Sequence, residues 1–299
     1  MTEQSYKNCT LCARNCHADR SVGVGYCRMS DRPTVARAAL HMWEEPPISG
    51  TRGSGTVFFS GCSLSCIYCQ NREISRGMSG VEITDERLAE IMLELEESGA
   101  HNINFVTPTH FIPNVREAIL TARRLGLRIP IVYNTGSYEN PSALRMLDGL
   151  IDVYLPDLKY FRSETAERLS SAPDYPAVAR AAIAEMFRQS GRAEINEEGI
   201  MTRGTVVRIL LLPGHVAEAK LSLKYLLDTY GDGIYISLMN QYTPMPNMPA
   251  PLDRKVTRDE YRQLTDYAVR LGLKNGFVQE WGTASESFIP PFDNTGVVK

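Results

Sequence analysis

The chain has 299 residues, of which 43% are hydrophobic and 22% are charged, a composition typical of globular proteins. The formal net charge of −3 argues against a broad basic surface for nucleic acid. No run approaches the roughly 20 consecutive apolar residues that a membrane helix needs, and the first residues carry no apolar signal region. We therefore expect a cytoplasmic protein that folds as one large α/β barrel or as two ordinary domains.

Residues 1–45 are predicted to form a cysteine-rich, metal-binding leader. The chain has seven cysteines, and an odd number without a secretion signal argues against a disulfide framework. The cysteines of the leader are Cys9, Cys12, Cys16 and Cys27. Their thiolates could hold a tetrahedral zinc ion or an auxiliary iron–sulfur cluster, and the sequence does not decide between them. A small cap with four free thiols is the simpler alternative.

A turn-rich stretch, residues 43–50, is predicted to join the leader to a main domain that spans residues 46–299. The glycine-rich stretch at 50–55 precedes a strand and lacks the Gly-Lys-Ser/Thr ending of a phosphate-binding loop. We therefore do not interpret it as a nucleotide site.

The other three cysteines directly follow an apolar run, 56–59, that predicts a buried strand. Cys62, Cys66 and Cys69 have the spacing C-x3-C-x2-C, which puts three thiols in a short loop at the carboxyl end of that strand. Barrel folds of the α/β class place their chemistry at this end. Three thiolates are one short of the four that hold an ordinary iron–sulfur cluster, so a cluster here would leave one iron open to an outside ligand.

Downstream of this loop, strand and helix patterns alternate. Strands are expected at 103–107, 129–134, 152–156, 206–212, 234–239 and 277–279. Helices are expected at 84–99, 114–125, 142–147, 175–189, 218–229 and 257–271, and a hairpin at 194–203. Such alternation means a parallel sheet with right-handed crossovers, and the units are too few for a full eight-fold barrel. The sequence therefore predicts an α/β fold, a partial (β/α)6-type open TIM barrel with a small N-terminal cysteine-rich extension.

Small polar and titratable residues recur at the carboxyl ends of the predicted strands, as they do around an enzyme site in a barrel. They include Thr107, Thr109, Asn134, Thr135, Asp157, Lys159 and His215. Asp157 and Lys159 are two residues apart, so on an extended segment they point to the same face, where they could bind a zwitterionic ligand or pair with each other. His215 is either a ligand contact or an ordinary loop histidine. His41 and His101 are interpreted as structural.

The cysteine loop resembles the signature of the radical S-adenosylmethionine (radical SAM) superfamily. The resemblance rests on Cys62, Cys66 and Cys69 and on the aromatic Tyr68 before the last cysteine. It implies a 4Fe-4S cluster on the three cysteines, with S-adenosylmethionine (SAM) chelated to the open iron. It further implies reductive cleavage of SAM to a 5′-deoxyadenosyl radical that abstracts hydrogen from a substrate. The cofactors would carry this chemistry, and the protein would position them and exclude water.

Further motifs are similar to the pyruvate formate-lyase activating enzymes, and more closely to relatives of these that carry a cysteine-rich leader. The motifs are Gly-Cys-x3-Cys-x-Tyr-Cys-Gln-Asn at 61–71, Asp-Leu-Lys at 157–159 and Leu-Pro-Gly-His at 212–215. The similarity implies that Tyr68 lies near the adenine and that Asp157, Lys159 and His215 contact SAM, with help from Asn134 or Thr135.

Two features depart from the activating enzymes. Their Gly-Gly-Glu segment is replaced by Val-Thr-Pro-Thr at 106–109, where Thr107 and Thr109 could take over the contact to the SAM amine. The extra cysteines precede the barrel, whereas some activating enzymes carry them in a later insertion.

The resemblance suggests two substrate classes: a glycyl-radical enzyme as protein partner, or a peptide or small metabolite that is modified directly. It also implies an electron donor such as flavodoxin or ferredoxin. The contrasting hypothesis is a non-catalytic iron–sulfur or zinc protein that acts in electron transfer or as a sensor.

Overall fold

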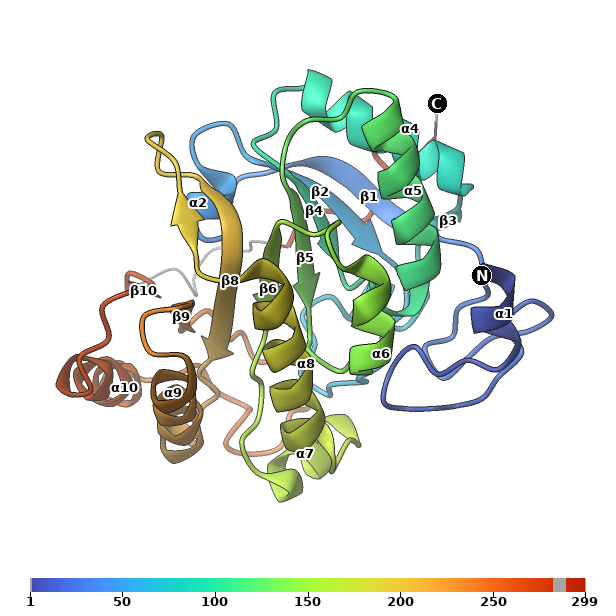
Figure 1. Cartoon of the computed structure of the whole chain (residues 1–299). Coiled ribbons are helices and arrows are strands. Elements are labelled where there is room, and N and C mark those ends of the chain that lie inside the picture. Colours follow the sequence, from blue (N-terminus) through green and yellow to red (C-terminus); the bar gives the residue numbers. More distant parts are fainter. Residues whose placement is uncertain (1, 282–288, 299) are drawn as a thin grey trace.

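Strands and helices alternate along most of the chain, as the sequence pattern predicts (Figure 1). The computed structural model describes residues 2–281 and 289–298. The strands are β1 (Thr34–His41), β2 (Ser54–Phe59), β3 (Val81–Glu82), β4 (Ile103–Val106), β5 (Ile131–Thr135), β6 (Val153–Pro156), β7 (Glu194–Ile195), β8 (Met201–Leu210), β9 (Tyr235–Met239) and β10 (Gly276–Val278). The α-helices are α1 (Thr2–Lys7), α2 (Pro46–Ser49), α3 (Arg72–Ser75), α4 (Asp85–Glu97), α5 (Ile112–Arg124), α6 (Pro141–Leu144), α7 (Ser163–Ser170), α8 (Tyr175–Ser190), α9 (Val216–Tyr230) and α10 (Arg258–Arg270). Two short 3-10 turns are η1 (Thr109–Phe111) and η2 (Arg145–Leu147).

The strands form one 10-stranded sheet in the order β10-β9-β8-β6-β5-β4-β2-β1-β3, with β7 paired to β8. Neighbours from β2 to β10 along this order are parallel, and β1, β3 and β7 pair antiparallel. Within the described residues, β10 and β3 are the two ends of the order, so the sheet stays open. The predicted α/β partial barrel is therefore confirmed.

Local signals in the sequence explain where the helices begin. The Thr84 hydroxyl accepts a hydrogen bond from the Arg87 backbone and caps α4. At α10, Thr257 and Glu260 form a reciprocal capping box. Helix α7 was not predicted, because its eight residues are mostly polar and only one face is buried.

The two faces of the sheet have different partners. On the outer face, Phe59 and Phe105 pack 5.9 Å apart, between ring centroids, within a core shared with α4 and α5. Side chains alternate between the two faces along a strand, so polar residues such as Asn104 of β4 and Asn134 of β5 lie on the inner face. The inner face of an open barrel is therefore available for a polar site.

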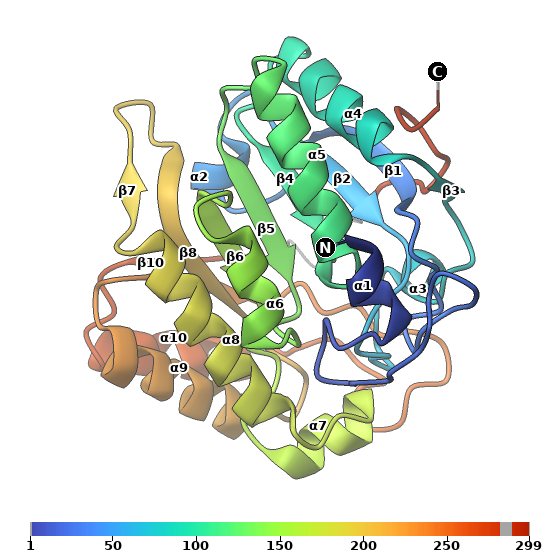
Figure 2. The same ribbon diagram turned by 45° about the vertical axis from the view of Figure 1, so that its right-hand side comes forward.

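The leader packs against the barrel and also extends its sheet. Residues 34–41, which the sequence analysis included in the leader without predicting a strand, form β1 and pair antiparallel with β2. Figure 2 shows α1 and the leader loops beside α5 and α3. At the other end of the chain, residues 289–298 run along β1, where the Ala38 backbone donates a 2.8 Å hydrogen bond to the Thr295 carbonyl.

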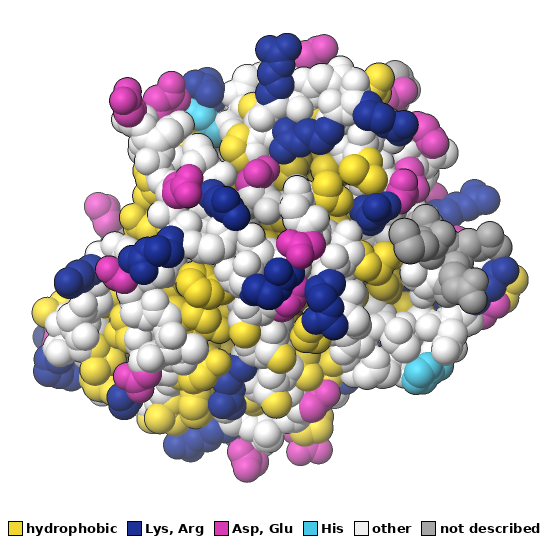
Figure 3. All heavy atoms as spheres, in the orientation of Figure 1, with side chains coloured by type: hydrophobic (Ala, Val, Ile, Leu, Met, Phe, Trp, Pro, Cys, Tyr) yellow, Lys and Arg dark blue, Asp and Glu magenta, His cyan; other side chains and the backbone are white. Residues whose placement is uncertain are grey.

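None of the helices in the described part of the chain is long and apolar enough to cross a membrane. Figure 3 shows lysine and arginine side chains interspersed with aspartate and glutamate over one face, without a broad region of a single sign.

Candidate active site

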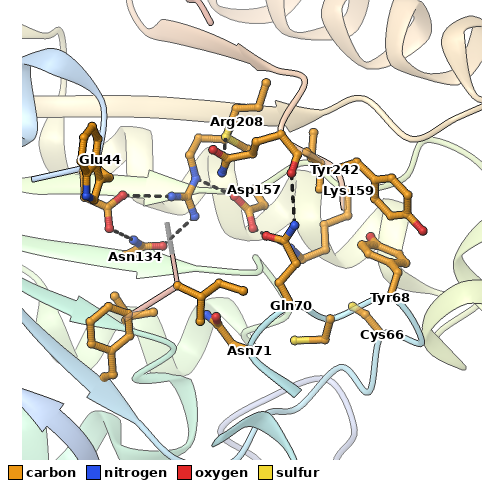
Figure 4. Close-up of a pocket in the computed structure, with 18 of the residues that line it drawn as sticks. Glu44, Cys66, Tyr68, Gln70, Asn71, Asn134, Asp157, Lys159, Arg208 and Tyr242 are labelled. Carbon is orange, nitrogen blue, oxygen red and sulfur yellow. Dashed lines mark hydrogen bonds and ion pairs between the residues drawn. The ribbon is translucent and has the colours of Figure 1, made fainter. Parts of the chain in front are cut away.

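A cavity lies at the carboxyl ends of the parallel strands and continues along the inner face of the sheet (Figure 4). One part, here called the cysteine chamber, has a volume of about 150 Å³ and is lined by all three loop cysteines and by Thr107, Thr109 and Thr135. The other part, the wide chamber, has a volume of about 240 Å³. The two chambers share the residues Cys66, Cys69, Asn71, Val106, Asn134, Asp157, Lys159 and Arg208. A ligand in the wide chamber would therefore touch two of the cysteines.

The three cysteines stand in a tight loop directly after β2. Gly61 opens the loop with a φ of +83°, a left-handed conformation that glycine adopts without strain. Two of the sulfurs accept hydrogen bonds: Cys62 from the Leu64 backbone at 3.4 Å and Cys66 from the Ser170 hydroxyl at 3.0 Å. Burial raises the pKa of the Cys62 thiol to about 12 and also raises the pKa of Cys69.

Four partly buried charged side chains form a chain of alternating sign beside the cysteines (Figure 4). Glu44 Oε2 lies 3.3 Å from Arg208 Nη1, and Arg208 Nε lies 2.7 Å from Asp157 Oδ1. Asp157 Oδ2 lies 2.5 Å from Lys159 Nζ. Burial opposes the charged form of Asp157, but Arg208 and Lys159 outweigh it and lower the pKa of this carboxyl group. The alternation explains why charges are tolerated in this interior.

Arg208 and Lys159 differ in how many of their donors are occupied. All three nitrogens of Arg208 are engaged, because its Nη2 donates a 2.7 Å hydrogen bond to Asn134 Oδ1. Lys159 Nζ has three N–H donors, and its one hydrogen bond in the described part of the chain goes to Asp157. Arg208 is therefore an anchor, whereas Lys159 keeps donors for a ligand.

An aromatic cluster forms one wall of the wide chamber. The Tyr68 ring meets those of Tyr160 and Tyr242 edge-on, with centroids 6.4 and 6.2 Å apart. The Tyr160 hydroxyl donates a 2.8 Å hydrogen bond to the Tyr68 hydroxyl. These contacts hold the Tyr68 ring in a fixed orientation, as a wall that packs against a flat ligand requires.

The three predicted threonines lie at the cysteine chamber in two different settings. Thr107 has a φ of +59°, which is unusual for a β-branched residue. The hydroxyl groups of Thr109 and Thr135 both donate to the buried Glu139 carboxylate. Thr109 and Thr135 therefore line the chamber with their hydroxyl groups already engaged, and Thr107 is the strained member of the set.

Two histidines lie elsewhere than the sequence analysis suggested. His215 begins α9, where its Nδ1 lies 2.7 Å from the Pro213 carbonyl and its Nε2 lies 3.0 Å from Arg168 Nη2. It lines a small cavity that it shares with Lys159, and it lines neither of the two chambers. His41, interpreted as structural, instead lines the wide chamber beside Phe58; the interpretation overlooked that β1 reaches the inner face.

Sequence reasoning missed Arg208 and Glu44. Arg208 is a lone charge within the apolar run 206–212, and this pattern is a signal that could have found it, because a charge inside a strand needs a buried partner. Glu44 lies in the turn-rich stretch 43–50 and carries no such signal. Only the fold reveals that this stretch returns to the inner face, where Glu44 Oε1 accepts hydrogen bonds from Asn104 and Asn134 at 3.0 and 3.2 Å.

Comparison with known proteins decides the family of this site. Residues 56–225, which include the cysteine loop and most of the charged chain, match the model of the radical SAM superfamily. The chain belongs to the radical SAM superfamily. It is also 26% identical, over 278 residues, to an uncharacterized protein of Methanocaldococcus jannaschii, a match that covers 90% of this chain and 76% of that protein.

Solved structures with a similar fold belong to longer chains. HydG, a maturase of the FeFe-hydrogenase, superposes with a TM-score of 0.52 at 17% identity, over 78% of this chain and 53% of that one. SuiB of Streptococcus suis, bound to its precursor peptide SuiA, gives a TM-score of 0.50 at 15% identity, over 75% and 48% of the two chains. The chain thus spans about half the length of the structures it matches, and at these identities the likeness concerns the fold.

The superfamily implies a 4Fe-4S cluster and SAM, and the residues present fit both. Within the described residues, no three Cys, His, Asp or Glu side chains are arranged around one single metal ion. A cluster poses a different requirement, because its irons are held by separate cysteines. Three sulfurs that line one chamber meet that requirement. The adjoining wide chamber offers Lys159, Asp157 and Tyr68 to a ligand that carries charged groups and a ring.

Proposed function

We propose that this radical SAM protein is an enzyme that reductively cleaves SAM and abstracts hydrogen from a substrate. When bound, a 4Fe-4S cluster on Cys62, Cys66 and Cys69 and SAM would supply the electron transfer and the 5′-deoxyadenosyl radical. The observation that carries the proposal is the shared lining of the two chambers, in which Cys66 and Cys69 stand together with Lys159 and Asp157.

The chain's own residues would bind and orient SAM. Lys159 keeps N–H donors toward the cavity and would bind a ligand carboxylate. Asp157 would interact with the ligand's positive groups, and Arg208 fixes its position. Tyr68 would pack against the adenine. Thr107 and Thr109 would serve the SAM amine, and Asn134 and Thr135 remain further proposed contacts.

The remaining predicted SAM contact, His215, would need a rearrangement of its loop to reach the ligand. In this structure its ring nitrogens are engaged by Pro213 and Arg168 outside both chambers. We therefore rank His215 below Lys159 among the proposed contacts. A His215→Ala variant that loses SAM affinity as strongly as Lys159→Met would contradict this ranking.

Two substrate classes follow from the proposal. One is a backbone glycine of a glycyl-radical enzyme, and the other is a peptide or small metabolite; the fold neighbour SuiB binds a precursor peptide. A glycyl radical seen by electron paramagnetic resonance in a co-expressed partner would favour the first class. Deuterium transfer from a labelled substrate into 5′-deoxyadenosine would favour the second.

The contrasting function is a non-catalytic electron carrier or sensor. Such a protein would need no chamber of about 240 Å³ lined by an organised charged chain, and this cavity is the observation that favours an enzyme. The test is incubation of the reconstituted, reduced protein with SAM, with a flavodoxin, a ferredoxin or dithionite as electron donor. Release of 5′-deoxyadenosine and methionine supports the proposal, and a fully reconstituted protein that never cleaves SAM contradicts it.

A further inference from the structure

The leader contains a fully buried cation without a carboxylate partner. Arg20 is 0% exposed. Its guanidinium donates to the carbonyls of Met29 and His110 at 3.0 and 2.6 Å, and to that of Ser30. No ion pair joins Arg20 to an aspartate or glutamate in the described part of the chain. A buried charge is costly unless an opposite charge compensates it, so this interior calls for negative charge.

The cysteines of the leader are the groups placed to supply that charge. Arg20 Nη1 lies 3.7 Å from Cys9 Sγ. Cys9, Cys12 and Cys27 are 5%, 8% and 6% exposed, and all seven cysteines of the chain are free thiols. A Cβ atom added to Gly25 would lie 3.5 Å from the sulfurs of both Cys16 and Cys27. Sulfurs from distant parts of the leader therefore gather around one glycine turn.

The leader is also tied directly to the cysteine loop. Arg14, two residues after Cys12, donates from its Nε to the Ser63 carbonyl at 2.8 Å, and from its Nη2 to the Ser170 carbonyl at 2.9 Å. Ser170 in turn donates to Cys66 Sγ. On the other side, the backbone at Gly61 packs closely against the leader, since a Cβ atom added there would lie only 2.7 Å from the Cys27 carbonyl oxygen. The two groups of cysteines thus belong to one packed unit.

We propose that Cys9, Cys12, Cys16 and Cys27 hold an iron–sulfur cluster, and that Arg14 fastens the cysteine loop to it. Four thiolates suit a cluster, and the complex carries net negative charge to compensate Arg20. As in the cysteine loop, the described side chains do not converge around a single ion, so the arrangement disfavours one zinc ion. The fastening role rests on the proposed function, because it assumes a cluster on the cysteine loop.

The metal centre is tested on a full-length variant that lacks the other site. Cys62, Cys66 and Cys69 are all replaced by alanine, and the anaerobically reconstituted protein is analysed for zinc, iron and sulfide. We expect about four iron atoms with brown absorbance per chain. A soluble triple variant without bound iron, or with zinc in its place, overturns the proposal. SAM cleavage plays no part in this readout, so failure of the proposed function gives a different result.

A second comparison keeps the proposal testable if the triple variant does not fold. Cys12→Ser in the otherwise unchanged chain should lose the leader's metal, whereas His17→Ala, which removes an exposed neighbour of Cys16, should keep it. Equal metal content in wild type, Cys12→Ser and His17→Ala overturns the metal centre.

The fastening role is tested by the rate at which a chelator bleaches the cluster of the cysteine loop. We expect Arg14→Ala to bleach about tenfold faster than wild type, the equivalent of one charge-assisted hydrogen bond. It should keep the leader's metal, and Arg14→Lys should fall in between. Arg32→Ala, at an exposed arginine of the leader, is the matched control. Bleaching of Arg14→Ala at the rate of Arg32→Ala overturns this role.

Discussion

Lys159 is the side chain on which the proposed SAM site depends most directly. Its ammonium group lines both chambers and uses one donor for Asp157. Lys159→Met keeps the length of the side chain and removes its charge. Asp157 keeps its 2.7 Å contact with Arg208 in the variant, so we expect the fold and the cluster to persist.

The expected effect follows from the interaction that is lost. A hydrogen bond to a charged group contributes about 1.5–3 kcal/mol, and each 1.4 kcal/mol corresponds to about a tenfold change in affinity. The KM for SAM should therefore rise about 10- to 150-fold. Because the ammonium would bind the methionine carboxylate equally before and during cleavage, kcat should change little.

The assay is the anaerobic release of 5′-deoxyadenosine as a function of SAM concentration, normalised to cluster iron. Lys224→Met is the matched control, because Lys224 is an exposed lysine that pairs with Asp228 on α9. A Lys159→Met protein with a complete cluster and an unchanged KM would refute the assignment of Lys159 to the SAM carboxylate.

Three further predictions concern the surroundings of the site. Arg208→Met leaves the carboxylates of Glu44 and Asp157 in the interior without the cation that pairs with both. In urea titrations it should therefore lower the free energy of unfolding by about 3–5 kcal/mol. The control is Arg203→Met, at an exposed position on β8, and a loss no larger than that of the control would contradict this prediction. Thr107→Gly relieves a backbone strain of about 1–3 kcal/mol, so it should not destabilise the fold. Because it also removes the hydroxyl group proposed to contact the SAM amine, it should raise the KM for SAM. Lower stability with an unchanged KM would argue against a ligand role. Burial, assisted by Arg20, lowers the pKa of His110 from 6.5 to about 3. Between those pH values, therefore, the His110 imidazole binds a proton only in the unfolded chain. The free energy of unfolding should fall by about 1.4 kcal/mol for each pH unit as the pH drops through this window. His110→Asn should remove this contribution to the pH dependence, and an unchanged pH dependence would contradict the reasoning.

Much of the fold could be predicted because its signals are local. Thr84 and Thr257, where two helices were predicted to begin, cap α4 and α10, and the predicted hairpin at 194–203 forms. The alternation of strands and helices sufficed for the open barrel. By contrast, β1 has a mixed sequence, and its place in the sheet depends on pairing with β2, a contact that no local pattern encodes.

The candidate site was predictable where its polar or charged residues directly follow a strand in the sequence. Asp157 and Lys159 were expected to share a face and either to bind a ligand or to pair, and they pair. Glu44 could not be found in this way, because it reaches the inner face from the turn after β1. The role of His215 stays a prediction. Its position after a strand suggested the site, and in the structure its Nε2 lies 3.0 Å from Arg168 Nη2.

The central claim is that this chain cleaves SAM with a cluster held by Cys62, Cys66 and Cys69. Its most direct test is the anaerobic reaction of reconstituted, reduced wild-type protein with SAM, measured beside Cys66→Ala. The account predicts 5′-deoxyadenosine and methionine from the wild type and neither product from Cys66→Ala, with the leader's metal retained in both. Wild-type protein with a complete cluster that releases no 5′-deoxyadenosine, or a Cys66→Ala variant as active as wild type, would contradict it.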